Sequence, residues 1–266
     1  MPSGPGLAVS QFAVLTEPIG AGLQALARTG IPALEIFMEG PQWWAADAFE
    51  EVRRARSAFA GPVSLHPPAW DVNIASYTAP VREAALGVYR QALEWAHRLE
   101  AAYVVVHVGW RGDPSLPRPA CLRRAEEAIG ILAPLAREAG VVLAVENVGW
   151  HGQEVCDQEE FTALAARLPD TAGVLLDVGH AYLAGWDLPE AFRTLASRLV
   201  AVHLHDNDGV ADRHLPIGDG TIGWAALHPV LHALPARCQC VLEYAPGTAL
   251  DRLREGAALL ARWLAR

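Results

Sequence analysis

The sequence predicts a (β/α)8 barrel formed by one domain over residues 1–266. Eight short and nearly continuous apolar runs alternate with helix-like amphipathic stretches along the whole chain. Strands that are buried on both faces of a parallel sheet have this composition. Eight strands close such a barrel, and 266 residues is an ordinary length for it. An open doubly wound sheet is the alternative, but no GxGxxG follows the first predicted strand.

The elements can be placed in order from the apolar runs and the residues that bound them. The predicted strands are Leu7–Leu15, Ala33–Met38, Val63–His66, Tyr103–Val108, Val141–Asn147, Gly173–Val178, Leu199–Leu204 and Cys240–Tyr244. The predicted helices are Ile19–Thr29, Ala46–Phe59, Pro80–Leu99, Arg118–Glu138, Gln158–Leu168, Leu188–Ser197, Trp224–Ala233 and Leu250–Leu264. Pro189 at a helix start, and Gly30 and Gly140 just beyond helix ends, support these boundaries.

Composition excludes some classes of protein. The chain is 52% apolar and has no uncharged apolar run of 18 residues, so we expect no membrane span. The N-terminus lacks a basic region before its apolar stretch, which argues against a signal peptide and for a cytoplasmic protein. The four cysteines form no CxxC pair and are expected to be reduced thiols. A net charge of −9 argues against a general nucleic-acid binder, although a local basic patch would be compatible with it.

Acidic or imidazole side chains stand near the ends of seven of the eight predicted strands. They are Glu35, His66, His107, Glu146, Asp177 (with His180 three residues later), His203 and Glu243. The carboxyl ends of all barrel strands meet on one face, where the active sites of such barrels lie. Converging carboxylates repel one another unless a cation neutralises them. The pattern therefore predicts a divalent metal, and the mixture of imidazole and carboxylate favours zinc or manganese.

The stretch Val200–Trp224 carries the densest group of such residues. His203 and His205 point to the same face of a strand, so spacing does not decide which of them binds the metal. Asp212 and His214 are also two residues apart, which in an extended segment places both side chains on one side.

Each candidate also has a purely structural interpretation. Glu146 and Glu243 could pair with Arg111 or Arg213, His66 and His107 could be hydrogen-bonded core histidines, and Asp177 could cap the turn after its strand. Seven tryptophans fall mostly in predicted loops after strands, where several could form the wall of a sugar pocket: Trp43, Trp44, Trp70, Trp110, Trp150, Trp186 and Trp224.

Six motifs give the chain a family resemblance. HPPAWDVNIAS, VVVHVGW, AVENVG, LLDVGHAYLAG, VHLHDNDGVADRHLPIGDGTIGW and VLEY together resemble the xylose-isomerase-like TIM-barrel superfamily over nearly the whole chain. That superfamily contains sugar isomerases and epimerases and also the endonuclease IV family. The resemblance to the isomerase branch implies that one metal is held by Glu146, Asp177, His203 and Glu243. It therefore implies that His203, and not His205, is the ligand.

The nuclease branch adds five ligands for a three-zinc site, and each has a counterpart here: His66, His107, His180, Asp212 and His214. One to three metal ions are therefore expected. Two segments depart from the nuclease pattern. This chain has LLDVGH where the nucleases have Leu-Asp-Thr-Cys-His, and HLHDND where they have His-Leu-Asn-Asp-Ser. Both segments are similar to those of the isomerase branch, and the net charge of −9 favours the same branch.

The resulting expectation is a divalent-metal-dependent isomerase or epimerase acting on a small sugar, ketose, inosose or hydroxy-keto acid. Glu146 and Glu243 would exchange a proton at the carbon beside a metal-polarised carbonyl. His180 and Arg213 are expected to orient substrate oxygens, and Glu35 and Trp110 to form the pocket wall. The alternatives are a zinc phosphodiesterase acting on abasic DNA and a non-catalytic barrel that binds a metal or a sugar. The resemblance also implies a homodimer.

Overall fold

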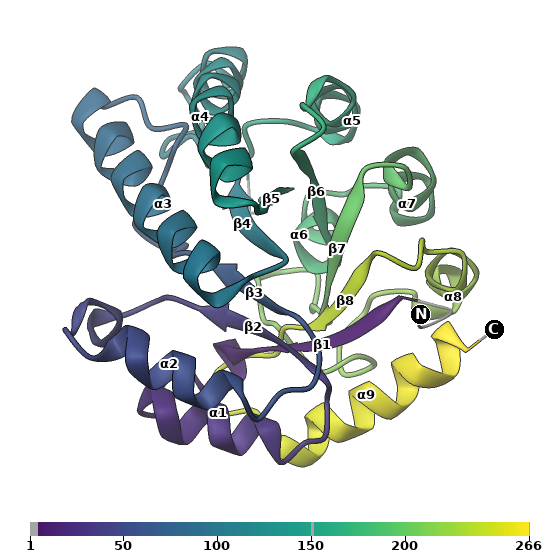
Figure 1. Ribbon diagram of the computed structural model, residues 1–266. Helices are drawn as coiled ribbons and strands as arrows, with labels where there is room; N and C mark the ends of the chain where they lie inside the picture. Colours follow the sequence, from purple (N-terminus) through teal and green to yellow (C-terminus); the bar gives the residue numbers. More distant parts are fainter. Residues whose placement is uncertain (1–4, 150–151, 266) are drawn as a thin grey trace.

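The computed structural model of the protein describes residues 5–149 and 152–265. Its eight parallel strands close into a barrel in which every strand pairs with its neighbours in sequence and β8 pairs with β1. Helices surround this barrel on the outside (Figure 1). The (β/α)8 barrel predicted from the sequence is thus confirmed.

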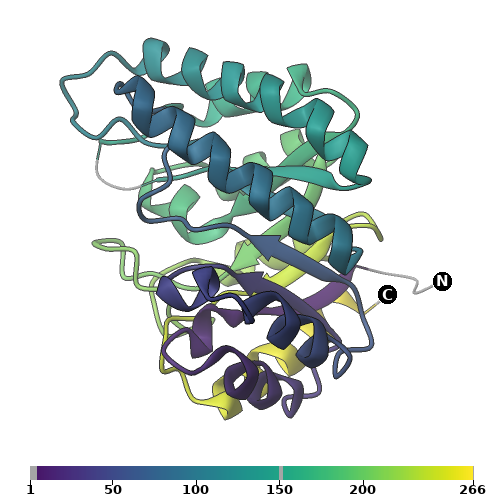
Figure 2. The ribbon, with the colours of Figure 1, turned by 60° about the vertical axis from the view of Figure 1, so that its left-hand side comes forward.

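The strands are β1 (Gly6–Ser10), β2 (Ala33–Phe37), β3 (Val63–His66), β4 (Tyr103–His107), β5 (Val142–Glu146), β6 (Ala172–Asp177), β7 (Leu199–Leu204) and β8 (Gln239–Leu242). The α-helices are α1 (Ile19–Ala27), α2 (Ala48–Arg56), α3 (Ala79–Leu99), α4 (Arg118–Ala139), α5 (Gln158–Arg167), α6 (Val178–Leu183), α7 (Leu188–Leu195), α8 (Trp224–His232) and α9 (Leu250–Leu264). Two short 3-10 helices, η1 (Gln11–Val14) and η2 (Pro41–Trp44), follow β1 and β2. The long helices α3 and α4 lie side by side, and the segment between β7 and α8 extends beyond the barrel (Figure 2).

Strand register brings the polar strand ends to one level. His107 at the end of β4 pairs with Glu146 at the end of β5, and Asp177 at the end of β6 pairs with His203 on β7. Below this level, small and apolar side chains such as Val105 fill the barrel interior. The larger apolar core lies between the strands and the surrounding helices. The polar layer therefore rests on a packed floor at the carboxyl ends of the strands.

Two local predictions are wrong. The first strand does not run to Leu15 but ends at Ser10, whose hydroxyl accepts a hydrogen bond from the backbone N–H of Phe12 at 3.2 Å and starts η1. Helix α6, directly after β6, was not expected. It begins because the Asp177 carboxylate accepts the backbone N–H of His180 at 2.6 Å, which is an N-cap interaction. The cap turns the His180 side chain back toward the barrel mouth.

No helix in the described part of the chain is long and apolar enough to cross a membrane. The four cysteines are buried and unpaired.

Candidate metal centre

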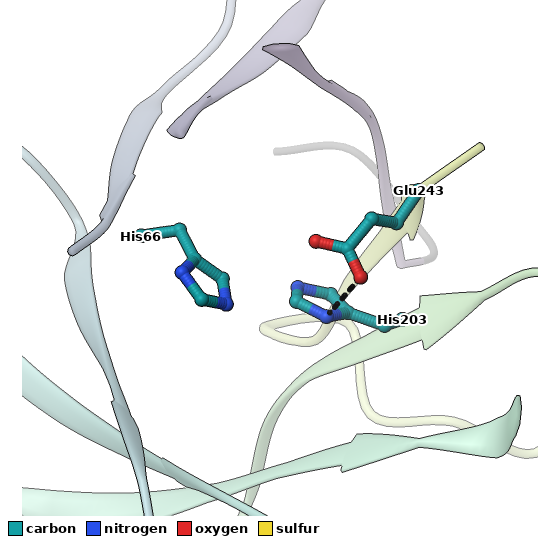
Figure 3. Close-up of side chains that lie close together, drawn as sticks. All are labelled: His66, His203 and Glu243. Carbon is teal, nitrogen blue, oxygen red and sulfur yellow. Dashed lines mark ion pairs between the residues drawn. The ribbon is translucent and has the colours of Figure 1, made fainter. Parts of the chain in front are cut away.

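His203 lies at the centre of the polar layer and is fully buried. Its Nδ1 atom is 3.1 Å from Glu243 Oε2, 3.3 Å from Glu146 Oε1 and 3.6 Å from Asp177 Oδ2. Figure 3 shows His66 from β3 and Glu243, which directly follows β8, pointing toward the His203 ring. Four strands thus bring an imidazole and three carboxylates to one point. This arrangement matches the four residues that the family resemblance implied as ligands of one metal.

Several atoms at this point lack the partners that a buried polar group needs. Among the described residues, both carboxylate oxygens of Glu146, His203 Nδ1 and Glu243 Oε1 are buried without a hydrogen bond. Unpaired buried charges are costly, whereas a cation would satisfy all of these atoms together. Burial alone would raise the pKa of Glu146, but the charges of His107 and His203 hold it well below its usual value. The donor set therefore fits a divalent metal.

The orientation of the His203 ring is fixed from behind by Glu35. His203 Nε2 donates to Glu35 Oε1 at 2.8 Å, and Glu35 Oε2 accepts from the hydroxyls of Tyr103 at 2.9 Å and Ser64 at 3.3 Å. Carboxylates that hold a metal-binding histidine in this way set its tautomer and raise its basicity. Glu35 was expected in the pocket wall; the structure places it fully buried beneath the site instead.

A second cluster joins β3, β4 and β5. The Nε2 atoms of His66 and His107 are 3.2 Å apart and lie 3.3 and 3.1 Å from Glu146 Oε2. His66 Nδ1 donates to the carbonyl of Pro67 at 2.8 Å, so Nε2 of the neutral ring carries a lone pair toward the cluster. These three side chains fit a further metal ion.

A third cluster lies on the β7–α8 segment and α6. Asp212 Oδ2 is 3.2 Å from His180 Nε2 and 2.9 Å from His214 Nε2. Each imidazole donates its Nδ1–H to a backbone carbonyl, that of Asn147 at 3.1 Å for His180 and that of Glu243 at 2.9 Å for His214. Burial would lower the pKa of His214, but Asp212 raises it to about 9. All five additional ligand positions implied by the nuclease branch are thus assembled in two groups of suitable geometry.

His205, which spacing could not distinguish from His203, has a different environment. Its Nε2 atom is 3.1 Å from both oxygens of Asp177, and its ring stacks on His214 with 3.8 Å between centroids. A ring nitrogen of His205 also comes within 4.8 Å of ligand atoms of His214 and Glu243. The ring packs against Gly179, where a Cβ atom would collide with it, so that only glycine fits there. His205 thus contacts Asp177 and also lies close enough to His214 and Glu243 to bind a metal ion with them.

The clusters open into a cavity of about 50 Å³. Among the described residues, its lining contains no arginine or lysine and consists of Phe12, Phe37, His66, Ala69, Trp70, His107, Glu146, His180, Asp212, His214 and Glu243. The sequence interpretation missed Phe12 and Phe37, although each follows or ends a barrel strand and its position alone could have indicated a place at the mouth.

Other expected site residues lie elsewhere. The Arg213 guanidinium pairs with Asp208 at 3.0 Å, and that of Arg111 binds the carbonyls of Pro114 and Leu116, so neither forms the ion pair with Glu146 or Glu243 considered as an alternative. Arg213 is not among the cavity residues. Trp110 exchanges hydrogen bonds with Asn73 and is also absent from the cavity lining. Trp150 lies outside the described residues.

Comparison with known proteins identifies the family of the chain. The sequence model of the xylose isomerase-like TIM barrel family matches residues 23–265. A protein of Heliobacterium modesticaldum named probable endonuclease 4 is 29% identical over 262 residues, which cover 85% of this chain and 88% of that protein. A D-tagatose 3-epimerase-like protein has a TM-score of 0.85 at 22% identity, with 97% of each chain covered. Endonuclease IV from Thermus thermophilus has a TM-score of 0.70 at 25% identity, covering 98% of this chain and 99% of that one. The chain belongs to the xylose isomerase-like TIM barrel family.

Proposed function

We propose that the protein is a divalent-metal-dependent isomerase or epimerase of small sugars or related hydroxy-ketones. The observation that supports this most directly is the position of His203 Nδ1 among Glu146, Asp177 and Glu243, two of which, Glu146 and Glu243, line a cavity at the barrel mouth. A divalent metal bound by these residues would supply Lewis-acid polarisation of a carbonyl and its neighbouring hydroxyl. Solved relatives of the same fold include D-psicose 3-epimerase and L-ribulose 3-epimerase.

Glu146 and Glu243 are the groups proposed to move the proton. Both line the cavity and both approach the same nitrogen of His203. Burial would raise the pKa of Glu243, but His203 and His214 lower it, so that the group is ionised and able to accept a proton. One carboxylate would remove the proton from the carbon beside the carbonyl and the other would return it.

The remaining lining residues would hold the substrate. His180 and His214 present polar atoms to the cavity, and Phe12 and Phe37 provide apolar surface that packs against the C–H groups of a sugar and excludes water. Arg213 has no part in this proposal, because its guanidinium forms an ion pair with Asp208.

The test is hydrogen exchange at the substrate carbon. Protein reconstituted with manganese or zinc is incubated in D2O with D-fructose, D-tagatose, D-psicose or L-ribulose, and deuterium incorporation is followed by NMR. We expect incorporation by the wild type and none by Glu146→Gln or Glu243→Gln, with Glu126→Gln on the surface of α4 as the matched control. Metal content and melting temperature are measured for each variant. Retained exchange in both active-site variants would remove the proposed mechanism.

A second candidate is a zinc phosphodiesterase. It is supported by the His66–His107–Glu146 and His180–Asp212–His214 groups, which could hold two further ions, and by relatives named probable endonuclease 4. Two or three zinc ions would activate a hydroxide and bind the leaving oxygen. The net charge of −9 and the cavity lining without arginine or lysine do not favour a DNA substrate. Incision of an abasic duplex by zinc-loaded protein, lost in Asp212→Asn, would support this candidate; no incision would dismiss it.

A further inference from the structure

We propose that the substrate is an uncharged ketose carrying a second ring, and that this ring binds in a groove beside the metal centre. The inference rests on the proposed function and specifies its substrate class. The groove has a volume of about 430 Å³ and runs between the segments that follow β1 and β2. Its lining residues are Leu15, Thr16, Glu17, Pro18, Glu39, Gly40, Pro41, Gln42 and Trp70.

Trp70 connects the groove to the metal centre, because it lines both the groove and the cavity above the metal ligands. Its side chain is exposed, with 58% of the residue accessible, which is unusual for a tryptophan. The backbone beneath it is fixed by the buried Glu39, whose Oε2 accepts the N–H of Ala69 at 2.8 Å and that of Trp70 at 3.2 Å. An open indole on a fixed backbone is a platform on which the apolar face of a ring can stack.

The groove walls are also fixed before any ligand binds. Gln42 Nε2 donates to the carbonyl of Leu15 at 3.4 Å and so joins the two wall segments. Pro18 and Pro41 restrict the backbone on each side. Of their lining residues, the cavity and the groove share Trp70, so a monosaccharide bound at the metal ligands would leave the rest of the groove to solvent.

Charge selects the kind of second group. The charged side chains that line the groove are Glu17 and Glu39, and both are acidic. Two carboxylates disfavour a phosphate or a nucleotide at this place, whereas the hydroxyls of a neutral sugar ring can donate to the exposed carboxylate of Glu17. The groove therefore suits a glycosyl group more than a phosphoryl group.

The experiment compares ligands that share one ketose and differ in what is attached to it. D-fructose, D-fructose 6-phosphate and the glucosyl-fructoses turanose, maltulose, leucrose and isomaltulose are titrated by calorimetry into the manganese-loaded protein. We expect at least one disaccharide to bind about tenfold more tightly than D-fructose, as stacking on an indole allows. We expect the phosphate to bind no more tightly than D-fructose.

Two tryptophan variants locate the effect. Trp70→Ala should reduce the ratio of the two Kd values to within about twofold of unity. Trp44→Ala removes another exposed tryptophan, 51% accessible and outside the groove lining, and should preserve the ratio. No disaccharide binding more tightly than D-fructose, or a ratio unchanged in Trp70→Ala, would overturn the inference.

Deuterium exchange on the same ligands separates this inference from the proposed function. If deuterium is incorporated into D-fructose but no disaccharide binds more tightly than D-fructose, the proposed second-ring site is refuted and the proposed proton transfer stands. If a disaccharide binds more tightly in a way that depends on Trp70, but no ketose incorporates deuterium, the second-ring site stands and the proposed proton transfer is refuted.

Discussion

Replacing Glu35 by glutamine should weaken metal binding by about 10- to 100-fold while the protein stays folded. The change retains the size of the side chain and one oxygen that can accept a hydrogen bond from His203 Nε2, which in the wild type lies 2.8 Å from Glu35 Oε1. It removes the negative charge from a fully buried pair. A hydrogen bond to a charged group contributes about 1.5–3 kcal/mol against about 1 kcal/mol for a neutral one. The lost electron donation to Nδ1 adds to this difference, and 10- to 100-fold corresponds to about 1.4–2.7 kcal/mol.

The assay is a competition titration of Mn²⁺ into the metal-free protein against a chelator of known affinity, with melting temperature as the check on folding. Glu39→Gln is the matched control, because Glu39 is another buried glutamate close to β2 but binds loop N–H groups and not a candidate ligand. Tyr103→Phe removes one hydrogen-bond donor to Glu35 and should weaken metal binding by a smaller factor than Glu35→Gln does. An affinity of Glu35→Gln within about threefold of the wild type would refute the role of Glu35, as would an equal loss in Glu39→Gln.

Three further predictions concern stability. Below pH 6.5 His214 is protonated in folded and unfolded chains alike. Because its folded pKa is raised to about 9, His214 should contribute a loss of about 3 kcal/mol to the unfolding free energy of the metal-free protein as the pH rises from 6.5 to 9, measured by urea denaturation. Asp206→Ala should cost at least about 3 kcal/mol in the same assay, since this buried carboxylate accepts from three backbone N–H groups and from Trp224 Nε1 at 2.7 Å. Gly179→Ala should cost about 1–3 kcal/mol, because the new Cβ would collide with the buried imidazole of His205.

Each stability prediction has a control in the chain. Between pH 6.5 and 9 the His214→Gln variant should lose about 3 kcal/mol less than the wild type, because the raised pKa values of His180 and His203 remain in the variant; an equal loss in both proteins would contradict the assigned shift. Asp208→Ala, at a partly exposed neighbour whose carboxylate accepts from two backbone N–H groups, should cost less than Asp206→Ala. Gly130→Ala, on α4 with open space around its Cβ position, should be neutral or stabilising. An equal cost for the Gly130 and Gly179 variants would contradict the packing argument.

The barrel could be predicted from the sequence because strand period and strand ends are local properties of the chain. A run such as Tyr103–Val108 is apolar on both faces, and His107 at its end stands where every parallel strand turns toward the mouth. The convergence of Glu146, Asp177 and Glu243 follows from closure alone. Helix α6 could not be predicted in this way, because it depends on the Asp177 side chain capping it and not on an apolar period.

The roles of side chains within the site depend on contacts that spacing does not determine. His203 and His205 share a strand face, and only the ring positions show that His203 Nδ1 meets the carboxylates while His205 binds Asp177. Glu35 reaches His203 across the barrel, 168 residues away in sequence; it stands in the middle of β2 and not at its end, so its side chain lies below the mouth. Arg213 stands beside Asp212 and His214 in sequence but turns outward to Asp208.

The central claim is that His203, Glu146, Asp177 and Glu243 bind a divalent metal, and metal content per chain tests it most directly. Wild-type protein purified without chelator, His203→Ala and Asp212→Asn would be examined by elemental analysis, with manganese and zinc measured separately. We expect at least one metal per wild-type chain, its loss in His203→Ala, and its retention at the His203 centre in Asp212→Asn. Two or three zinc ions per wild-type chain would favour the phosphodiesterase over the isomerase or epimerase. Wild-type protein without bound metal after incubation with excess manganese or zinc would contradict the claim.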